Sequence, residues 1–200
     1  MPEITAITPH GPGGQLGAAC NRAIEHAHTE WVLLHDDDVL LKLHPNWRAL
    51  CETAIEIHPD VGLFTCWTNS IGRQKHTTEP LVPPDAPGPL AKVSEHIEMA
   101  RRIWEQHGYN VTPLTDVEVG GFFHLTSKTA WLAAGGYPGL GMFDEDHGYC
   151  RALKAAGFAV ARIDGLYVYH MGSIRGHREH SWMPGEKTAR ELWESLKRDK

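Results

Sequence analysis

Three consecutive aspartates, Asp36, Asp37 and Asp38, follow the apolar run 31–34 after a single histidine, His35. Such a run predicts a buried strand, and the carboxyl ends of parallel strands form the edge at which α/β sheets bind ligands. In an extended chain, Asp36 and Asp38 point to one side of the strand and Asp37 to the other. The sequence therefore predicts an acidic ligand site at the edge of a sheet.

Neighbouring carboxylates repel one another unless a positive charge lies between them. A divalent cation that prefers oxygen ligands is the simplest candidate, and we expect Asp36 and Asp38 to be its ligands. The alternative is a solvated acidic turn.

Runs with strand character alternate along the chain with segments of helical periodicity, which predicts an α/β fold with a mainly parallel sheet flanked by helices. The expected strands are 4–8, 31–34, 61–67, 117–125, 158–163 and 166–169. The expected helices are 16–27, 47–57, 90–106, 127–134, 147–156 and 186–197.

A chain of 200 residues normally forms one domain, so we expect 1–200 to be a single domain. Five prolines interrupt residues 69–89, which predicts a long surface loop, and loops of this length often bind ligands. Residues 171–185 are glycine-rich and basic, which predicts a flexible loop before the closing helix 186–197.

The net charge of −6 disfavours a general binder of nucleic acid. The four cysteines form no CxxC pair, which indicates buried thiols in a reducing compartment. No stretch is long and apolar enough to span a bilayer. We therefore expect a cytoplasmic protein without a membrane span.

Several segments occur in an order that resembles the metal-dependent GT-A glycosyltransferases, Rossmann-related enzymes, and most of all their family 2. They are a helix with Gly17 and Asn21, the strand 31–34 with its Asp36-x-Asp38 motif, the segment 120–137 with its glycine pairs, the Glu145-Asp146 helix that ends in Ala156-Gly157, and the strand that ends in His170. The resemblance covers roughly residues 4–170.

The resemblance implies transfer of a sugar from a nucleotide-diphosphate donor to an acceptor hydroxyl, with inversion, and UDP is the commonest nucleotide of this fold. The expected metal ligands are Asp38, Asp36 and His170, and mixed Asp and His ligands suit Mn²⁺ better than Mg²⁺. The expected donor-binding residues are Asp36, Asp37, Asn21, Arg175 and Arg178, the two arginines as clamps on the diphosphate.

Asp146 is the expected general base, which removes the proton of the acceptor hydroxyl, and Glu145 is expected to orient the acceptor or Asp146. The alternative is that both acids merely favour the N-terminus of a helix.

Two features depart from the family pattern. The usual first strand-helix-strand unit, which holds the nucleotide base, is not recognisable, and residues 4–8 correspond either to the third strand of the family or to the first strand of a shortened fold. Gly148 and Ala152 stand where the family often has Asp and Arg.

Two other functions stay open. The chain could be a non-catalytic or split module that needs a partner chain for nucleotide binding, and an exposed sheet edge would then favour homo-oligomers. It could also be a metal-dependent phosphohydrolase that uses the aspartate run. The sequence does not identify the acceptor, although its acidity disfavours nucleic acid.

Overall fold

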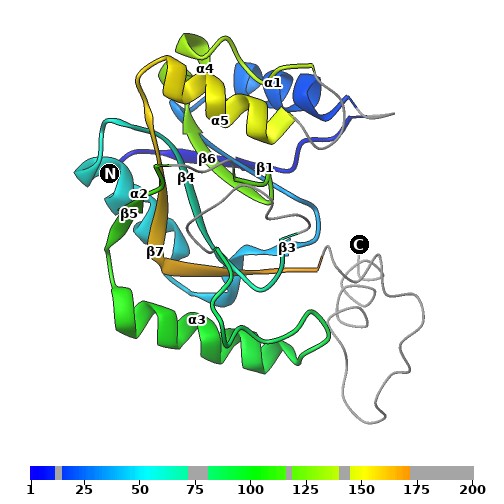
Figure 1. The fold of residues 1–200 in the computed structure, drawn as a ribbon, viewed down its shortest axis with the longest axis vertical. Coiled ribbons are helices and arrows are strands. Elements are labelled where there is room, and N and C mark those ends of the chain that lie inside the picture. Colours follow the sequence, from blue (N-terminus) through cyan, green and yellow to red (C-terminus); the bar gives the residue numbers. More distant parts are fainter. Residues whose placement is uncertain (12–14, 72–80, 116–118, 140–144, 172–200) are drawn as a thin grey trace.

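The computed structural model describes residues 1–11, 15–71, 81–115, 119–139 and 145–171 (Figure 1). These residues form a mixed sheet with helices on both sides. The strands are β1 (Ile4–Ile7), β2 (Trp31–His35), β3 (Val39–Leu40), β4 (Val61–Thr68), β5 (Val111–Pro113), β6 (Phe123–Ser127) and β7 (Ala159–His170). The helices are α1 (Leu16–His26), the 3₁₀ turn η2 (Leu41–Leu43), α2 (Trp47–Ile57), α3 (Val93–His107), α4 (Lys128–Ala133) and α5 (Glu145–Ala155).

The sheet has the strand order β1-β2-β6-β4-β7-β3, and β5 pairs with the first half of β7. Strands β1, β2, β4 and β7 all run in the same direction, whereas β6 lies antiparallel between β2 and β4. The expected α/β class with a mainly parallel sheet is confirmed. Because β2, β4 and β7 share a direction, their carboxyl ends and the start of β6 meet at one edge of the sheet.

The helices form two groups around the sheet. Helices α1, α4 and α5 lie together at the top of Figure 1, and α3 lies at the bottom, along the second half of β7. The main core lies between the sheet and its helices and contains the apolar residues of β2 that were predicted to be buried. A smaller core lies between α3 and the end of β7, around Met99, Tyr167 and Tyr169.

Strand β7 is continuous from Ala159 to His170, so the prediction of two separate strands here was wrong. Its pairing with β4 shifts at a bulge between Ile163 and Tyr167, where the strand turns sharply (Figure 1). The buried pair Arg162–Asp164 joins Nε to Oδ1 at 2.7 Å and fixes the bulge. A side chain at Gly165 would overlap the carbonyl of Gly108, so only glycine fits there. The bend directs the end of β7 and His170 toward the ends of β2 and β4.

Strand β6 begins at Phe123, several residues later than the strand predicted for 117–125. The two glycines before it do not join the ladder, because the N–H of Gly121 is hydrogen-bonded to a side chain of α5 instead. The short elements β3, β5 and η2 were not predicted, since two or three residues carry no periodicity.

Part of the proline-rich segment is anchored to the fold. The N–H of Thr68 donates to the carbonyl of Leu81 at 2.9 Å, and the Leu81 side chain is buried in the core. The described residues of 69–89 contain no helix or strand, as expected. The segment does not lie wholly on the surface, however, because Leu81 is buried in the core. Both the basic loop 171–185, apart from Met171, and the closing helix 186–197 lie outside the described residues.

All four cysteines are buried thiols, as expected. Within the described ranges, no helix is long and apolar enough to cross a membrane.

Candidate active site

The three aspartates lie in a turn that connects β2 to β3. The N–H of Val39 donates to the carbonyl of Asp36 at 3.3 Å and closes this turn. Val39 pairs with His170 of β7, and the carbonyl of Asp38 accepts the N–H of Met171 at 3.0 Å. The two-residue strand β3 thus holds the aspartates against the end of β7.

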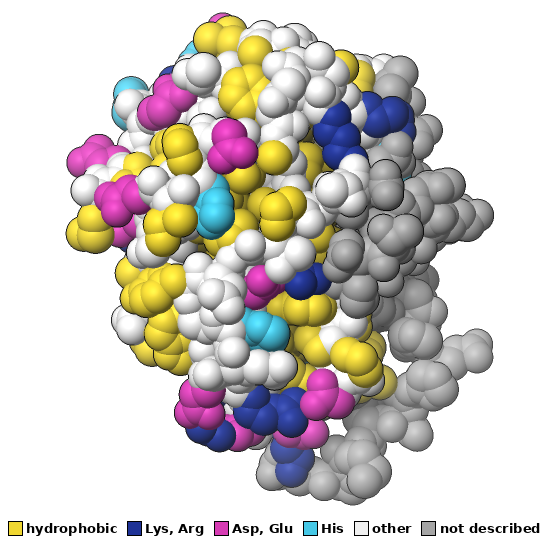
Figure 2. Space-filling model, turned by 60° about the vertical axis from the view of Figure 1, so that its left-hand side comes forward, with side chains coloured by type: hydrophobic (Ala, Val, Ile, Leu, Met, Phe, Trp, Pro, Cys, Tyr) yellow, Lys and Arg dark blue, Asp and Glu magenta, His cyan; other side chains and the backbone are white. Residues whose placement is uncertain are grey.

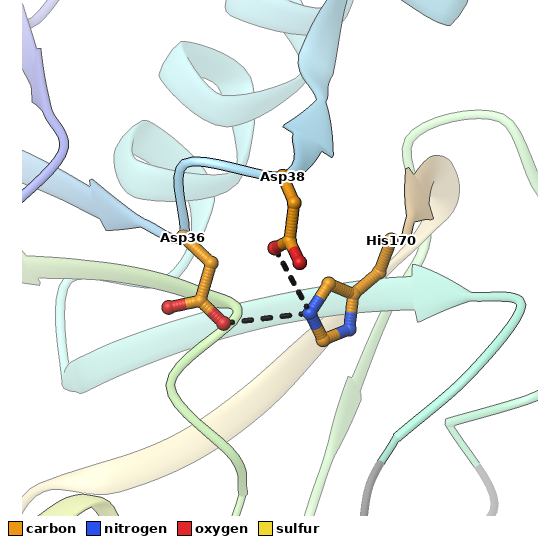
Figure 3. A group of neighbouring side chains, drawn as sticks. All are labelled: Asp36, Asp38 and His170. Atoms are coloured by element: carbon orange, nitrogen blue, oxygen red, sulfur yellow. Dashed lines mark ion pairs between the residues drawn. The ribbon is translucent and has the colours of Figure 1, made fainter. Parts of the chain in front are cut away.

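Asp36, Asp38 and His170 converge on one point (Figure 3). Nε2 of His170 lies 3.4 Å from Oδ2 of Asp36 and 3.3 Å from Oδ1 of Asp38. Asp38 and His170 are mostly buried, whereas 41% of the Asp36 side chain is exposed. Burial disfavours a charged imidazole, but the two carboxylates outweigh this effect and raise the pKa of His170 to about 10.

The end of β4 fixes the orientation of His170. The backbone N–H of His170 donates to Oδ1 of Asn69 at 2.7 Å, and its Nδ1 lies 3.0 Å from the carbonyl of Ser70. A carbonyl accepts only, so Nδ1 carries the proton of this bond and Nε2 faces the carboxylates. A bond of this kind on the far ring nitrogen is the usual support of a metal-bound histidine.

The three groups fit a divalent cation. Two ligands of an ion at about 2.1 Å lie roughly 3 to 4 Å apart, and the distances from Nε2 to the two carboxylates fall within this range. The structure brings Asp36 and Asp38 together as predicted, although by a turn and not by an extended chain. Asp37 is exposed. Metal binding itself stays a prediction.

Asp146 lies in the first turn of α5, at the same edge of the sheet. The backbone N–H of Gly121 donates to its Oδ2 at 2.8 Å. A Cβ at Gly121 would lie 2.6 Å from Oδ1 and 2.7 Å from Oδ2, so the carboxylate can approach only because the residue is glycine. Burial raises the pKa of Asp146 to about 6, with a smaller contribution in the same direction from Asp36 and an opposing one from the Gly121 hydrogen bond.

The dipeptide Gly121-Phe122 connects Asp146 to the acidic turn. Gly121 binds Asp146, while the carbonyl of Phe122 accepts the N–H of Asp36 at 3.3 Å. The ring of Phe122 also stacks on His170, with the ring centres 5.8 Å apart. This short piece of backbone therefore fixes Asp146 relative to Asp36, Asp38 and His170.

Glu145 is buried, and its side chain packs against Gly17 of α1. Asn21 of α1 accepts from the indole N–H of Trp131 at 2.8 Å and from the N–H of Tyr137 at 2.7 Å, and it donates to the carbonyl of Tyr137 at 2.9 Å. These contacts give Asn21 a structural role. Its predicted role in donor binding stays a prediction. Arg175 and Arg178 lie outside the described residues.

Sequence reasoning missed Gly121, Phe122 and Asn69. One signal was present, because glycine inside a predicted strand, here Gly120 and Gly121 within 117–125, often marks a close approach of another group to the backbone. Nothing in the sequence indicated that Asn69 would contact His170, which lies 101 residues away.

The comparison with protein families decides the identity. A family model described as "Glycosyltransferase like family 2" matches residues 2–199. The chain belongs to this family. This confirms the resemblance to family 2 of the GT-A glycosyltransferases and the fold class, and the family implies a nucleotide-sugar donor and an acceptor. No curated protein matches the chain.

Proposed function

We propose that this glycosyltransferase moves a sugar from a nucleoside-diphosphate donor, with UDP favoured, to an acceptor hydroxyl, and that it depends on Mn²⁺ or Mg²⁺. The observation that carries the proposal is the arrangement at the sheet edge. One cluster of two carboxylates and an imidazole lies beside a separate, partly buried carboxylate with a raised pKa, and Gly121-Phe122 links them. Two acidic groups in different environments suit two different roles.

Asp38, Asp36 and His170 would hold the cation. When bound, it would neutralise the negative charge that develops on the leaving diphosphate. Asp38 is the most buried of the three and is the first choice for a direct ligand, whereas the half-buried Asp36 can bind directly or through water. Asp37, which is exposed, would contact the donor.

Asp146 would be the general base. Its pKa of about 6 leaves it ionised at neutral pH, yet close enough to neutrality to take up a proton efficiently. The Gly121 hydrogen bond holds the carboxylate in one orientation, so it can accept the proton of the acceptor hydroxyl as that oxygen attacks. Attack assisted by a single base on the face opposite the leaving group inverts the sugar configuration. Glu145 would act by holding the first turn of α5.

A nucleic acid is disfavoured as the acceptor. On the face drawn in Figure 2, the described Lys and Arg side chains are mixed with acidic and apolar ones and form no continuous basic stripe. Binding to a phosphate backbone needs such a stripe, and the net charge of the chain is −6.

The test is a transfer assay with UDP-sugars, Mn²⁺ and a panel of acceptors, with release of UDP as the readout. Asp146→Asn should bind UDP and Mn²⁺ as the wild type does and lose turnover. The matched control is Asp85→Asn, because Asp85 is an exposed acid paired with Arg102 outside the site. Equal turnover in Asp146→Asn and Asp85→Asn would refute the role of the base. Phosphate release without any acceptor would instead favour a phosphohydrolase.

A further inference from the structure

Two buried rings lie beneath the segment that holds Asp146. His124 of β6 and Tyr137, which precedes α5, are 1% and 4% exposed. Nδ1 of His124 and the hydroxyl of Tyr137 are hydrogen-bonded at 2.8 Å, and their rings stack with centres 6.1 Å apart. The chemistry proposed above assigns no role to this pair.

Tyr137 is held rigidly at three places. Asn21 binds both its N–H and its carbonyl, at 2.7 and 2.9 Å. Its ring stacks on Tyr149 of α5, with the ring centres 4.0 Å apart. The Tyr137 hydroxyl therefore has a fixed position, from which it orients the imidazole of His124.

His124 lies three residues after Gly121, on the segment that begins β6. Among the described residues, Nε2 of His124 has no hydrogen-bond partner, so the Tyr137 hydroxyl at Nδ1 is what orients the ring. Tyr137 in turn stacks on Tyr149, three residues after Asp146 on α5, so the pair joins the segment that carries Gly121 to the helix that carries Asp146. Burial lowers the pKa of His124 to about 4, so the ring is neutral at physiological pH and serves as a fixed dipole.

We propose that Tyr137 and His124 are positioning residues for Asp146: their hydrogen bond ties the start of β6, which carries the Gly121 N–H, to the stack on α5, which carries the Asp146 carboxylate, and so keeps donor and acceptor in register. The inference rests on the proposed role of Asp146 as the base. It assigns a function to a buried polar pair that would otherwise only add a hydrogen bond to the core.

The structure supplies a matched control for Tyr137→Phe. Tyr149 stacks on Tyr137 and is equally buried, but its hydroxyl bonds to Thr126 at 2.8 Å. Thr126 also bonds to the carbonyl of Gly62 at 2.7 Å, so Tyr149→Phe leaves it with a partner. The two variants each remove one buried hydroxyl from the same stack, and only the Tyr137 hydroxyl bonds to His124.

The first readout does not depend on activity. A backbone N–H that donates to a carboxylate has a downfield amide proton in NMR spectra, and Asp146→Asn marks the position of the Gly121 amide without that charge. In Tyr137→Phe the Gly121 resonance should move at least half of the way toward its Asp146→Asn position. In Tyr149→Phe it should stay at the wild-type position. A Gly121 resonance that is unmoved in folded Tyr137→Phe overturns the proposal.

The second readout is the split between kcat and KM. Tyr137→Phe should lower kcat about tenfold or more, because small misplacements of a catalytic group are costly, and leave the donor KM within about twofold. Equal kcat in Tyr137→Phe and Tyr149→Phe would also overturn the proposal. If the wild type transfers no sugar although the Gly121 resonance responds as expected, the proposed function fails and the positioning of Asp146 stands.

A variant pair at His124 covers the case in which Tyr137→Phe does not fold. His124→Asn retains a polar group at the place of Nδ1 and should keep the Gly121 resonance nearer to wild type than His124→Leu. If the two His124 variants give the same Gly121 resonance, the positioning role is wrong.

Discussion

Gly121→Ala tests the geometry of the proposed base most sharply. A Cβ at this position would lie 2.6 Å from Oδ1, 2.7 Å from Oδ2 and 2.8 Å from Cγ of Asp146. To reach an ordinary contact of 3.4 Å, the carboxylate must retreat by about 0.8 Å. The hydrogen bond from the Gly121 N–H, now 2.8 Å, would lengthen or break.

The expected loss follows from that displacement. A misplacement of about 1 Å in a catalytic group can cost on the order of 100-fold in rate, and a hydrogen bond to a charged group contributes roughly 1.5–3 kcal/mol. We expect kcat for sugar transfer to fall about 10- to 100-fold in Gly121→Ala, with little change in binding of UDP and Mn²⁺, because Asp36, Asp38 and His170 keep their own contacts.

The adjacent glycine is the control. A Cβ at Gly120 would meet only Cγ2 of Ile71, at an ordinary 3.5 Å, so Gly120→Ala should keep kcat near the wild-type value. The rate of UDP release under saturating donor and acceptor, with the melting temperature of each variant, gives the comparison. The reasoning is refuted if Gly121→Ala is folded and as active as Gly120→Ala.

Three further predictions concern Asp146, Asn21 and Asp164. As pH falls below about 6, Asp146 becomes protonated, and kcat/KM should drop about tenfold per pH unit; a flat profile between pH 5 and 7 would contradict the assignment. Asn21→Ala loses three hydrogen bonds and should lower the free energy of unfolding by about 2–4 kcal/mol in urea titrations; a loss within the error of the titration would show that these bonds do not hold the fold. Asp164→Asn removes the carboxylate paired with buried Arg162 and should cost about 3 kcal/mol or more, whereas the exposed Asp85→Asn should cost less than about 1; equal costs would contradict the role of burial.

The sequence predicted the parts of the site that depend on local patterns. Because Asp36 and Asp38 follow the apolar run of β2 in the sequence, they were predicted to lie at a sheet edge, and they do. The approach of His170 and Asp146 to that edge was implied by the family resemblance. Residue spacing alone could not bring them there, since β7 and α5 lie more than 100 residues from β2.

The contacts that connect these groups could not be predicted. The pairing of Val39 with His170 involves a strand of two residues, which carries no periodic signal. The bulge in β7 depends on the fit between Gly165 and Gly108 and on a buried ion pair, and neither is visible in a pattern of polar and apolar residues. The bonds that Asn21 makes to Tyr137 likewise join segments that are far apart in the chain.

Calorimetric titration with UDP, GDP, CDP and dTDP, with and without Mn²⁺, tests the central claim most directly. The account predicts that one nucleotide, most favourably UDP, binds only with the cation, and that Asp38→Ala abolishes this binding while Asp85→Ala preserves it. Failure of the folded wild type to bind any of the four would contradict an autonomous metal-dependent transferase and favour a module that needs a partner chain. Binding that is equally strong without the cation, or in Asp38→Ala, would contradict the proposed metal centre.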